Sequence, residues 1–133
     1  MCQSAIQWIA FCEMFRIFTQ TNRNLTMRYK RLELDCNGLT EHELNKMLKN
    51  SLGFVDWYGM NWDAMIDCLS LMRYPNEGMS DITLEDDEIL IIECKSLSKA
   101  KFDVNTFIGV IETVNEREIS KGNNSQIQLT LIS

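Results

Sequence analysis

The sequence predicts an α/β domain in which helices pack on a three-stranded parallel sheet. Three short segments, residues 27–36, 87–96 and 126–133, have the alternating or continuous apolar patterns of strands. Helical patterns fill the stretches between them, so at least one helix separates each strand from the next. Because strands joined through a helical crossover lie parallel, we expect the order strand, helix, helix, strand, helix, strand.

A further helical pattern precedes the first strand. Residues 4–19 place apolar side chains on a wide stripe at helical spacing, and the turn formers of "TQTNRN" end it. A second methionine, Met27, then stands directly before the first strand. We therefore expect residues 1–26 to be an N-terminal helical extension, either appended to the domain or outside it, and residues 27–133 to be the domain.

The first strand and the first helix of this domain have clear local signals. Residues 27–36, "MRYKRLELDC", alternate as a strand does, and "NGL" follows as a turn signal. In the helix predicted over residues 39–52, Thr40 and Glu43 have the spacing of a capping box. Its apolar side is formed by Leu44, Met47, Leu48 and Leu52.

A loop and a second helix come next. The loop "GFVDWYGM" begins at Gly53 and contains Gly59 near its end. Asn61 then has the position of an N-cap, which predicts a helix over about residues 62–72. The only proline, Pro75, lies in the "RYPNEGMS" stretch that ends this helix.

The remaining elements alternate between strand and helix. Residues 87–96, "DEILIIECKS", contain a continuous apolar run bounded by charges, which predicts a strand buried on both faces. Residues 104–119 have a helical pattern that ends at "KGNNS". Residues 126–133, "QIQLTLIS", alternate as a closing strand.

The chain is acidic, and its negative charge is concentrated in one block. The net charge is −6, with 19 acidic and 13 basic residues, while residues 54–93 hold ten acids and a single base, Arg73. A nucleic-acid binder needs clustered Lys and Arg, so this balance argues against one. The block predicts either a solvated acidic face or a field that steers a basic partner.

Two acids of this block, Asp63 and Asp67, lie four residues apart in a helix that is otherwise largely apolar. Residues at this spacing share one helical face, so their charges repel each other. Trp62 faces away from them, and we assign it to the core. We expect the counter-charges of the two aspartates to lie on another molecule.

Motifs for catalysis and metal binding are missing from the sequence. It contains no glycine-rich phosphate loop and no nucleophile elbow, and its one histidine, His42, lies on the capped helix. The five cysteines have no CxxC spacing and pair with no histidine at zinc-ligand spacing. We therefore expect no enzyme activity, no cofactor and no metal. The alternative is a hydrolase that uses Asp63 and Asp67 as an acid–base pair.

Cysteine usage and the N-terminal sequence bear on location. The odd number and wide spacing of the cysteines indicate reduced thiols, as in a cytosolic protein. The N-terminus lacks the basic region and the cleavage site of a signal peptide, and Glu13 and Arg16 interrupt its apolar run. We expect a cytoplasmic protein that does not enter a membrane.

Residues 52–69, "LGFVDWYGMNWDAMIDCL", resemble a motif of the barstar family of ribonuclease inhibitors. In that family an aromatic–Tyr–Gly–x–Asn–x–Asp–Ala–x–x–Asp–Cys–Leu run joins a loop to the second helix. The matching residues here are Trp57, Tyr58, Gly59, Asn61, Asp63, Ala64, Asp67, Cys68 and Leu69. The likeness extends from about residue 32 to residue 133, whereas residues 1–26 have no counterpart.

The resemblance implies an immunity protein that plugs the active site of a basic ribonuclease toxin and needs no cofactor. In that role Asp67 imitates a substrate phosphate, and Asp63 adds charge in the first helical turn, where the helix dipole also favours an anion. Trp57 is an aromatic anchor, and Gly59 allows a backbone angle or a close approach. The partner-binding residues implied in this way are Trp57, Gly59, Asn61, Asp63, Ile66, Asp67, Ser70 and Glu116.

The sequence also departs from the family pattern. Ile66 stands where members often carry tryptophan, and Met72 replaces a further aromatic residue. The family's contact carboxylate on the last helix falls on Glu112, Glu116 or Glu118. These differences leave a second hypothesis, in which a barstar-fold interaction module binds another class of toxin or a regulatory protein.

Overall fold

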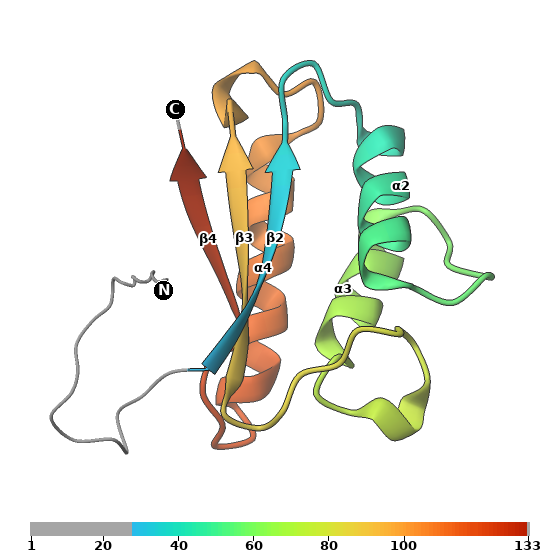
Figure 1. The fold of residues 1–133 in the computed structure, drawn as a ribbon, viewed down its shortest axis with the longest axis vertical. Coiled ribbons are helices and arrows are strands. Elements are labelled where there is room, and N and C mark those ends of the chain that lie inside the picture. The colour runs from blue at the N-terminus through green and yellow to red at the C-terminus, as the bar shows by residue number, and fades with distance from the viewer. Residues whose placement is uncertain (1–27, 133) are drawn as a thin grey trace, which may run out of the picture.

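The computed structural model describes residues 28–132, so the helical extension predicted for residues 1–26 lies outside the described part of the chain. The main elements follow in the predicted order, strand, helix, helix, strand, helix, strand (Figure 1). They are β2 (Arg28–Asp35), α2 (Glu41–Leu52), α3 (Trp62–Ser70), β3 (Glu88–Lys95), α4 (Val104–Ile119) and β4 (Ile127–Ile132). Short 3-10 turns occupy Pro75–Glu77 and Leu97–Lys99.

The strands form one parallel sheet in the order β2-β3-β4. Leu32 of β2 pairs with Ile92 of β3, which in turn pairs with Leu129 of β4. The connection from β2 to β3 contains α2 and α3, and the connection from β3 to β4 contains α4. In Figure 1, α4 lies behind the sheet while α2 and α3 stand to one side, and α3 packs against α4. The predicted α/β class and the three-stranded parallel sheet are confirmed.

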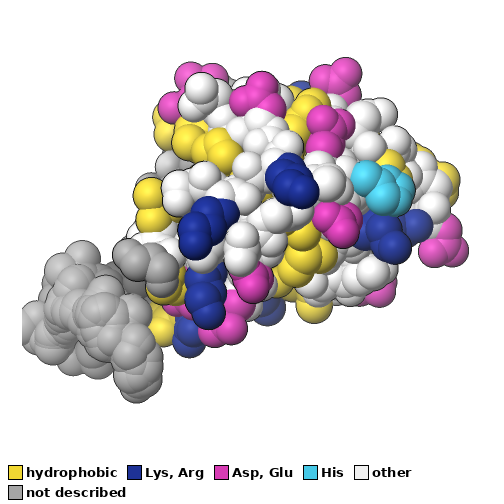
Figure 2. All heavy atoms as spheres, turned by 90° about the horizontal axis from the view of Figure 1, so that it is seen from above, with side chains coloured by type: hydrophobic (Ala, Val, Ile, Leu, Met, Phe, Trp, Pro, Cys, Tyr) yellow, Lys and Arg dark blue, Asp and Glu magenta, His cyan; other side chains and the backbone are white. Residues whose placement is uncertain are grey.

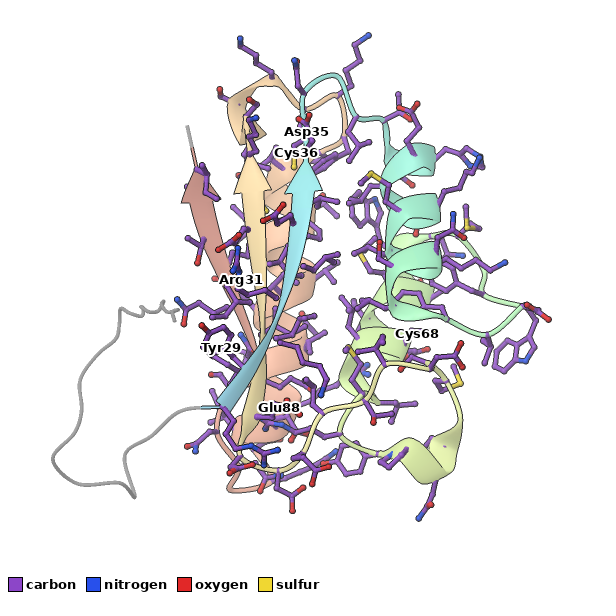
Figure 3. The ribbon with its side chains drawn as sticks, in the orientation of Figure 1. Tyr29, Arg31, Asp35, Cys36, Cys68 and Glu88 are labelled. Atoms are coloured by element: carbon purple, nitrogen blue, oxygen red, sulfur yellow. The ribbon has the colours of Figure 1, made fainter. Side chains whose placement is uncertain are left out.

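The sheet has one buried face and one half-exposed face. In β3, Leu90, Ile92 and Cys94 are buried in the core, whereas the side chains that alternate with them are half-buried. Arg31 of β2 lies on this second face (Figure 3) and forms an ion pair of 2.9 Å with Glu93 of β3. The prediction that the middle strand is buried on both faces is therefore wrong, because the described helices cover only one of them.

Local contacts fix both ends of α2. The capping box is confirmed: the Thr40 hydroxyl accepts from the Glu43 N–H at 3.2 Å, and the Glu43 carboxylate accepts from the Thr40 N–H at 3.0 Å. After the helix, Gly53 adopts a left-handed φ of 68°. A Cβ at this position would lie 2.6 Å from the side chain of Asp81. The chain therefore leaves α2 along a path that requires glycine.

The second helix is shorter than predicted. Asn61 caps α3 as expected, and its side-chain oxygen accepts from the Ala64 N–H at 2.7 Å. The helix ends at Ser70 rather than near residue 72, because Leu71, with φ −100° and ψ 10°, leaves helical geometry. Met72 is nevertheless fully buried, which explains why the apolar pattern continues beyond the end of the helix.

Candidate functional site

The loop between α2 and α3 is fastened to the core by Tyr58. This side chain is buried, its hydroxyl donates a hydrogen bond to the side-chain oxygen of Asn45 on α2, and its ring lies 4.9 Å from that of Phe54. The backbone N–H of Val55 also donates to the carbonyl of Met79 at 3.1 Å. These contacts hold the loop at residues 53–60 against the core before α3 begins.

The turn from this loop into α3 depends on close packing at Gly59. A Cβ on Gly59 would lie 3.2 Å from the side-chain nitrogen of Asn61 and 3.4 Å from the Cβ of Ala64. The side-chain amide of Asn61 donates to the Gly59 carbonyl at 3.3 Å. The left-handed backbone angle belongs instead to Met60, with φ 56°. Of the two reasons expected for a glycine here, the close approach is the one the structure supports.

Trp57 and Asp67 lie beside the same hollow. The Trp57 side chain is 73% exposed, an unusual state for a large aromatic residue. The hollow has a volume of about 280 Å³ and is lined by Trp57, Tyr58, Gly59, Ala64, Asp67, Cys68 and Met79. We call the exposed surface formed by Trp57, Gly59, Asn61, Asp63 and Asp67 the acidic face.

The two aspartates of the acidic face differ in their surroundings. Asp63 is exposed in the first turn of α3, and none of the ion pairs formed within residues 28–132 includes it. Asp67 is also exposed, but its Oδ1 accepts from Arg117 Nη1 of α4 at 3.3 Å. The expectation that both counter-charges lie on another molecule is therefore wrong for Asp67.

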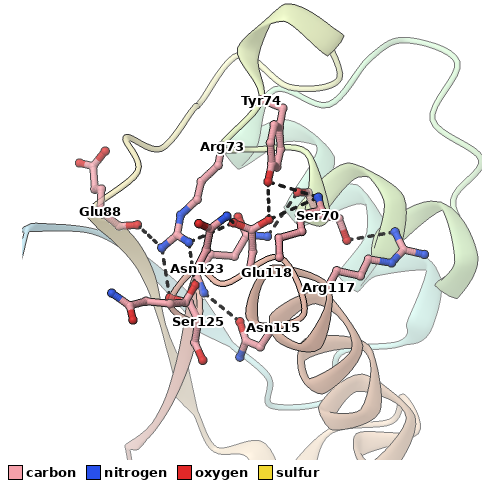
Figure 4. Close-up of polar contacts among 12 residues, drawn as sticks. Ser70, Arg73, Tyr74, Glu88, Asn115, Arg117, Glu118, Asn123 and Ser125 are labelled. Atoms are coloured by element: carbon pink, nitrogen blue, oxygen red, sulfur yellow. Dashed lines mark hydrogen bonds and ion pairs between the residues drawn. The ribbon is translucent and has the colours of Figure 1, made fainter.

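Arg117 also ties Asp67 to Ser70. The same Nη1 donates to the Ser70 hydroxyl at 3.2 Å (Figure 4). Ser70 is buried, with 4% of its surface exposed, and its carbonyl accepts from Gln126 Nε2 at 3.3 Å. Ser70, a predicted contact on α3, is therefore buried beneath Arg117, whereas Glu116, the predicted contact on α4, is exposed.

Ile66 and Trp62 lie at the border of the acidic face and the core. Both side chains are half-buried and pack against the core. Trp62 thus contacts the core as predicted. Ile66 keeps part of its surface exposed on the same helix as the aspartates.

Glu118 is buried, so its carboxylate is not available at the surface for contact with a partner. It has no exposed surface, and its carboxylate accepts from Arg73 Nη1 at 3.2 Å and from the Tyr74 hydroxyl at 2.8 Å (Figure 4). Burial by itself would raise the pKa of Glu118, but the hydrogen bonds from Tyr74, Arg73 and Asn123 outweigh it and lower that pKa. Glu112 and Glu116 are the exposed carboxylates that remain.

Arg73 is the centre of this buried network. Besides Glu118, its guanidinium donates to the backbone carbonyls of Glu88, Asn124 and Ser125 at distances of 2.7–3.1 Å. The network joins the segment after α3 to the C-terminal end of α4 and to the starts of β3 and β4. It therefore fixes α3, which carries the acidic face, against α4, which carries Arg117.

Sequence reasoning missed two residues of this region. Arg73 has a signal, because it is the only base in the acidic block of residues 54–93. Arg117 has none, since it lies 50 positions from Asp67 and sits in an ordinary polar position of a helix.

One cysteine, Cys68, lines the hollow beside the acidic face. The Cys68 thiol beside it is buried, and burial together with the negative charge of Asp67 raises its pKa to about 11, so the thiol stays protonated near neutral pH. His42 is exposed on α2, and Figure 2, seen from the end where the strands finish, shows the histidine at the surface. No group of metal-ligating side chains is arranged for an ion within the part of the chain that the structure describes.

The three-stranded parallel sheet, its helices and the exposed loop and helix of the acidic face together define the class, an α/β protein. The family model for Barstar (barnase inhibitor) matches residues 29–131. The chain therefore belongs to the barstar family, a family of ribonuclease inhibitors. No curated protein matches the chain. Among residues 28–132 no helix has the length and hydropathy needed to cross a membrane.

Proposed function

We propose that this protein is an immunity protein that binds and blocks the active site of a cationic ribonuclease toxin. The loop at residues 53–60 and α3 enter the active site, and Asp67 takes the place of a substrate phosphate. The observation that carries the proposal is the shared position of Trp57 and Asp67 at one hollow, on a loop held by the buried Tyr58–Asn45 hydrogen bond and a helix capped by Asn61.

The physical chemistry of the acidic face suits this role. A ribonuclease active site uses cations to bind phosphate, and a carboxylate on a fixed helix accepts the same charge-assisted hydrogen bonds. In this proposal Trp57 inserts as the aromatic anchor, and Asp63 adds a second charge at the helix N-terminus, where the dipole favours an anion. The acidic block of residues 54–93 speeds association by steering a basic partner.

The same geometry supports a role in binding and not in turnover. Asp63 and Asp67 could form an acid–base pair only with a nucleophile or a polarising group nearby. The thiol beside Asp67 is held protonated by burial, and Arg117 holds the Asp67 carboxylate from the other side. We therefore propose that the protein acts as an inhibitor without catalytic activity or a cofactor.

A second candidate is a barstar-fold module whose partner is a non-ribonuclease toxin or a regulatory protein. The ion pair between Arg117 and Asp67 favours this second candidate in one respect. The Arg117 charge already offsets part of the negative charge that Asp67 needs as a phosphate mimic. Tight binding to a partner without loss of RNA cleavage would support this candidate.

The test is an RNA cleavage assay with barnase and with ribonucleases encoded by reading frames next to the gene of this protein. The wild-type chain should abolish cleavage by at least one of them at near-stoichiometric concentration. Asp67→Ala should weaken that inhibition by at least about 30-fold, because loss of one partner in a desolvated charge pair costs about 2–5 kcal/mol.

The matched control is Asp86→Ala, which removes one exposed carboxylate from the turn before β3. It changes the net charge by the same amount and removes only one steering charge of the acidic block, so it should inhibit within a few-fold of the wild type. Equal inhibition by Asp67→Ala and Asp86→Ala would contradict the role of Asp67, and failure of the wild type against every ribonuclease tested would contradict the proposed function.

A further inference from the structure

Two cations border the acidic face on the side of α4. Arg117 and Lys121 lie four residues apart, so they share one side of the C-terminal part of this helix and the turn after it. Their side chains are 45% and 52% exposed, respectively. We call Arg117 and Lys121 the basic pair.

Both cations are held in place by residues of α3 and of the segment after it. Arg117 Nη1 donates to Asp67 and to Ser70. The Lys121 ammonium lies 4.4 Å from the centre of the Tyr74 ring, donates to the Tyr74 hydroxyl at 3.2 Å and lies 3.7 Å from the Glu118 carboxylate. Ser70 is buried beneath Arg117, and Tyr74 is held by the buried Glu118, so each cation has one support fixed by the core and the basic pair is preorganised for a ligand.

The basic pair keeps free donors that point to an anionic ligand. In its contacts with described residues, the Arg117 side chain uses only Nη1. Its other guanidinium N–H groups can therefore donate two hydrogen bonds to one carboxylate of a ligand. Asp67 likewise engages Arg117 through Oδ1 alone, which leaves Oδ2 for a cation of the partner. Arg117 can therefore remain paired with Asp67 and bind a second carboxylate.

We propose that the binding face of this protein is bipolar and that Arg117 and Lys121 determine its specificity. The partner presents cations to Asp63 and Asp67 and, beside them, one or more Asp or Glu carboxylates to the basic pair. This inference rests on the proposed function and adds the chemistry of the partner. A ribonuclease whose surface is cationic throughout is disfavoured, because its charges would face Arg117 and Lys121 across the interface.

Charge reversal of the basic pair tests the inference, because the result depends on whether inhibition becomes weaker or stronger. The Arg117→Glu/Lys121→Glu variant makes the face uniformly acidic. A bipolar partner should then bind at least about 100-fold more weakly, because like charges meet at the interface. The probe is the ribonuclease inhibited by the wild type in the cleavage assay, with barnase tested in parallel, and the readout is the inhibition constant.

The control is Lys99→Glu/Lys101→Glu, which reverses two exposed lysines near the start of α4 and changes the net charge equally. Its inhibition should stay within a few-fold of the wild type or improve slightly through steering. Circular dichroism and thermal melting show whether each variant is folded. If the double reversal fails to fold, Arg117→Gln replaces it, with a smaller loss of inhibition expected.

The outcomes separate this inference from the proposed function. If charge reversal leaves inhibition unchanged or strengthens it while Asp67→Ala abolishes it, the bipolar face is wrong and the proposed function stands. If the wild type inhibits no ribonuclease, both are wrong. Loss of inhibition in the reversal variant and not in its control supports the bipolar face.

Discussion

Arg117 and Glu118 are neighbours in α4, yet they belong to two different kinds of ion pair. Glu118 is fully buried against Arg73, with 0% and 2% of the two side chains exposed. Arg117 meets Asp67 at the surface, where 45% and 61% of the side chains are exposed. The buried pair fixes α3 against α4, whereas in the proposed function the exposed pair offers charge to a partner. Changes at the two pairs should therefore separate stability from binding.

The largest effect on stability should come from removing one partner of the buried pair. Glu118→Ala leaves the Arg73 guanidinium buried without its counter-charge and also removes the acceptor of Tyr74. The free energy of unfolding should fall by about 3–5 kcal/mol, as measured by urea denaturation. A loss below about 1 kcal/mol would show that the network does not hold the two helices together.

The buried pair should also make the protein sensitive to acid. The folded-state pKa of Glu118 is lowered, so its contribution to stability is complete above the unfolded-state pKa of about 4.3. That contribution is lost as the pH falls through the lower folded-state pKa. Glu118→Gln should flatten this part of the stability profile, measured by urea denaturation between about pH 3 and pH 7. Parallel profiles for the wild type and the variant would contradict the assignment.

Removing a neutral buried hydrogen bond should lower the free energy of unfolding by an amount between the effects at the two ion pairs. Tyr58→Phe leaves the side-chain oxygen of Asn45 without the donor that fastens the loop to α2. Stability should fall by about 1–3 kcal/mol, as measured by thermal or urea unfolding. Inhibition should fall less than in Asp67→Ala, because Phe54 and the backbone bond from Val55 to Met79 still hold the loop.

The exposed pair should have the smallest effect on stability. Arg117→Ala should change the free energy of unfolding by less than about 1 kcal/mol, because solvent screens both charges. Among residues 28–132, the other hydrogen-bond partner of the Arg117 side chain is the Ser70 hydroxyl. A loss as large as that of Glu118→Ala would mean that the two ion pairs do not differ in role.

Local sequence signals predicted most of the fold and part of the acidic face. Thr40 with Glu43, and Asn61 before α3, could be found because a cap and the N–H groups that it binds lie within three residues. The three strands followed from their own apolar patterns. The half-exposed second face of the sheet could not be predicted, because a continuous apolar run does not reveal whether helices cover one face of the strand or both.

The charges around the acidic face depend on contacts between distant segments. Asp67 and Arg117 are 50 residues apart, and Arg73 and Glu118 are 45 residues apart. No helical or strand period relates these positions, so the sequence does not show which carboxylate is neutralised. For the same reason Glu118 had the pattern of a surface residue, although Arg73 and Tyr74 of the segment after α3 bind its buried carboxylate.

Asp67→Asn tests the role of the exposed pair most directly, because it removes the charge and keeps the shape of the side chain. The measurement is its inhibition constant against the ribonuclease that the wild type inhibits, made beside its free energy of unfolding. We predict a loss of inhibition of at least about 30-fold with stability within about 1 kcal/mol of the wild type. Unchanged inhibition in a variant of wild-type stability would contradict the assignment of Asp67 as the phosphate mimic.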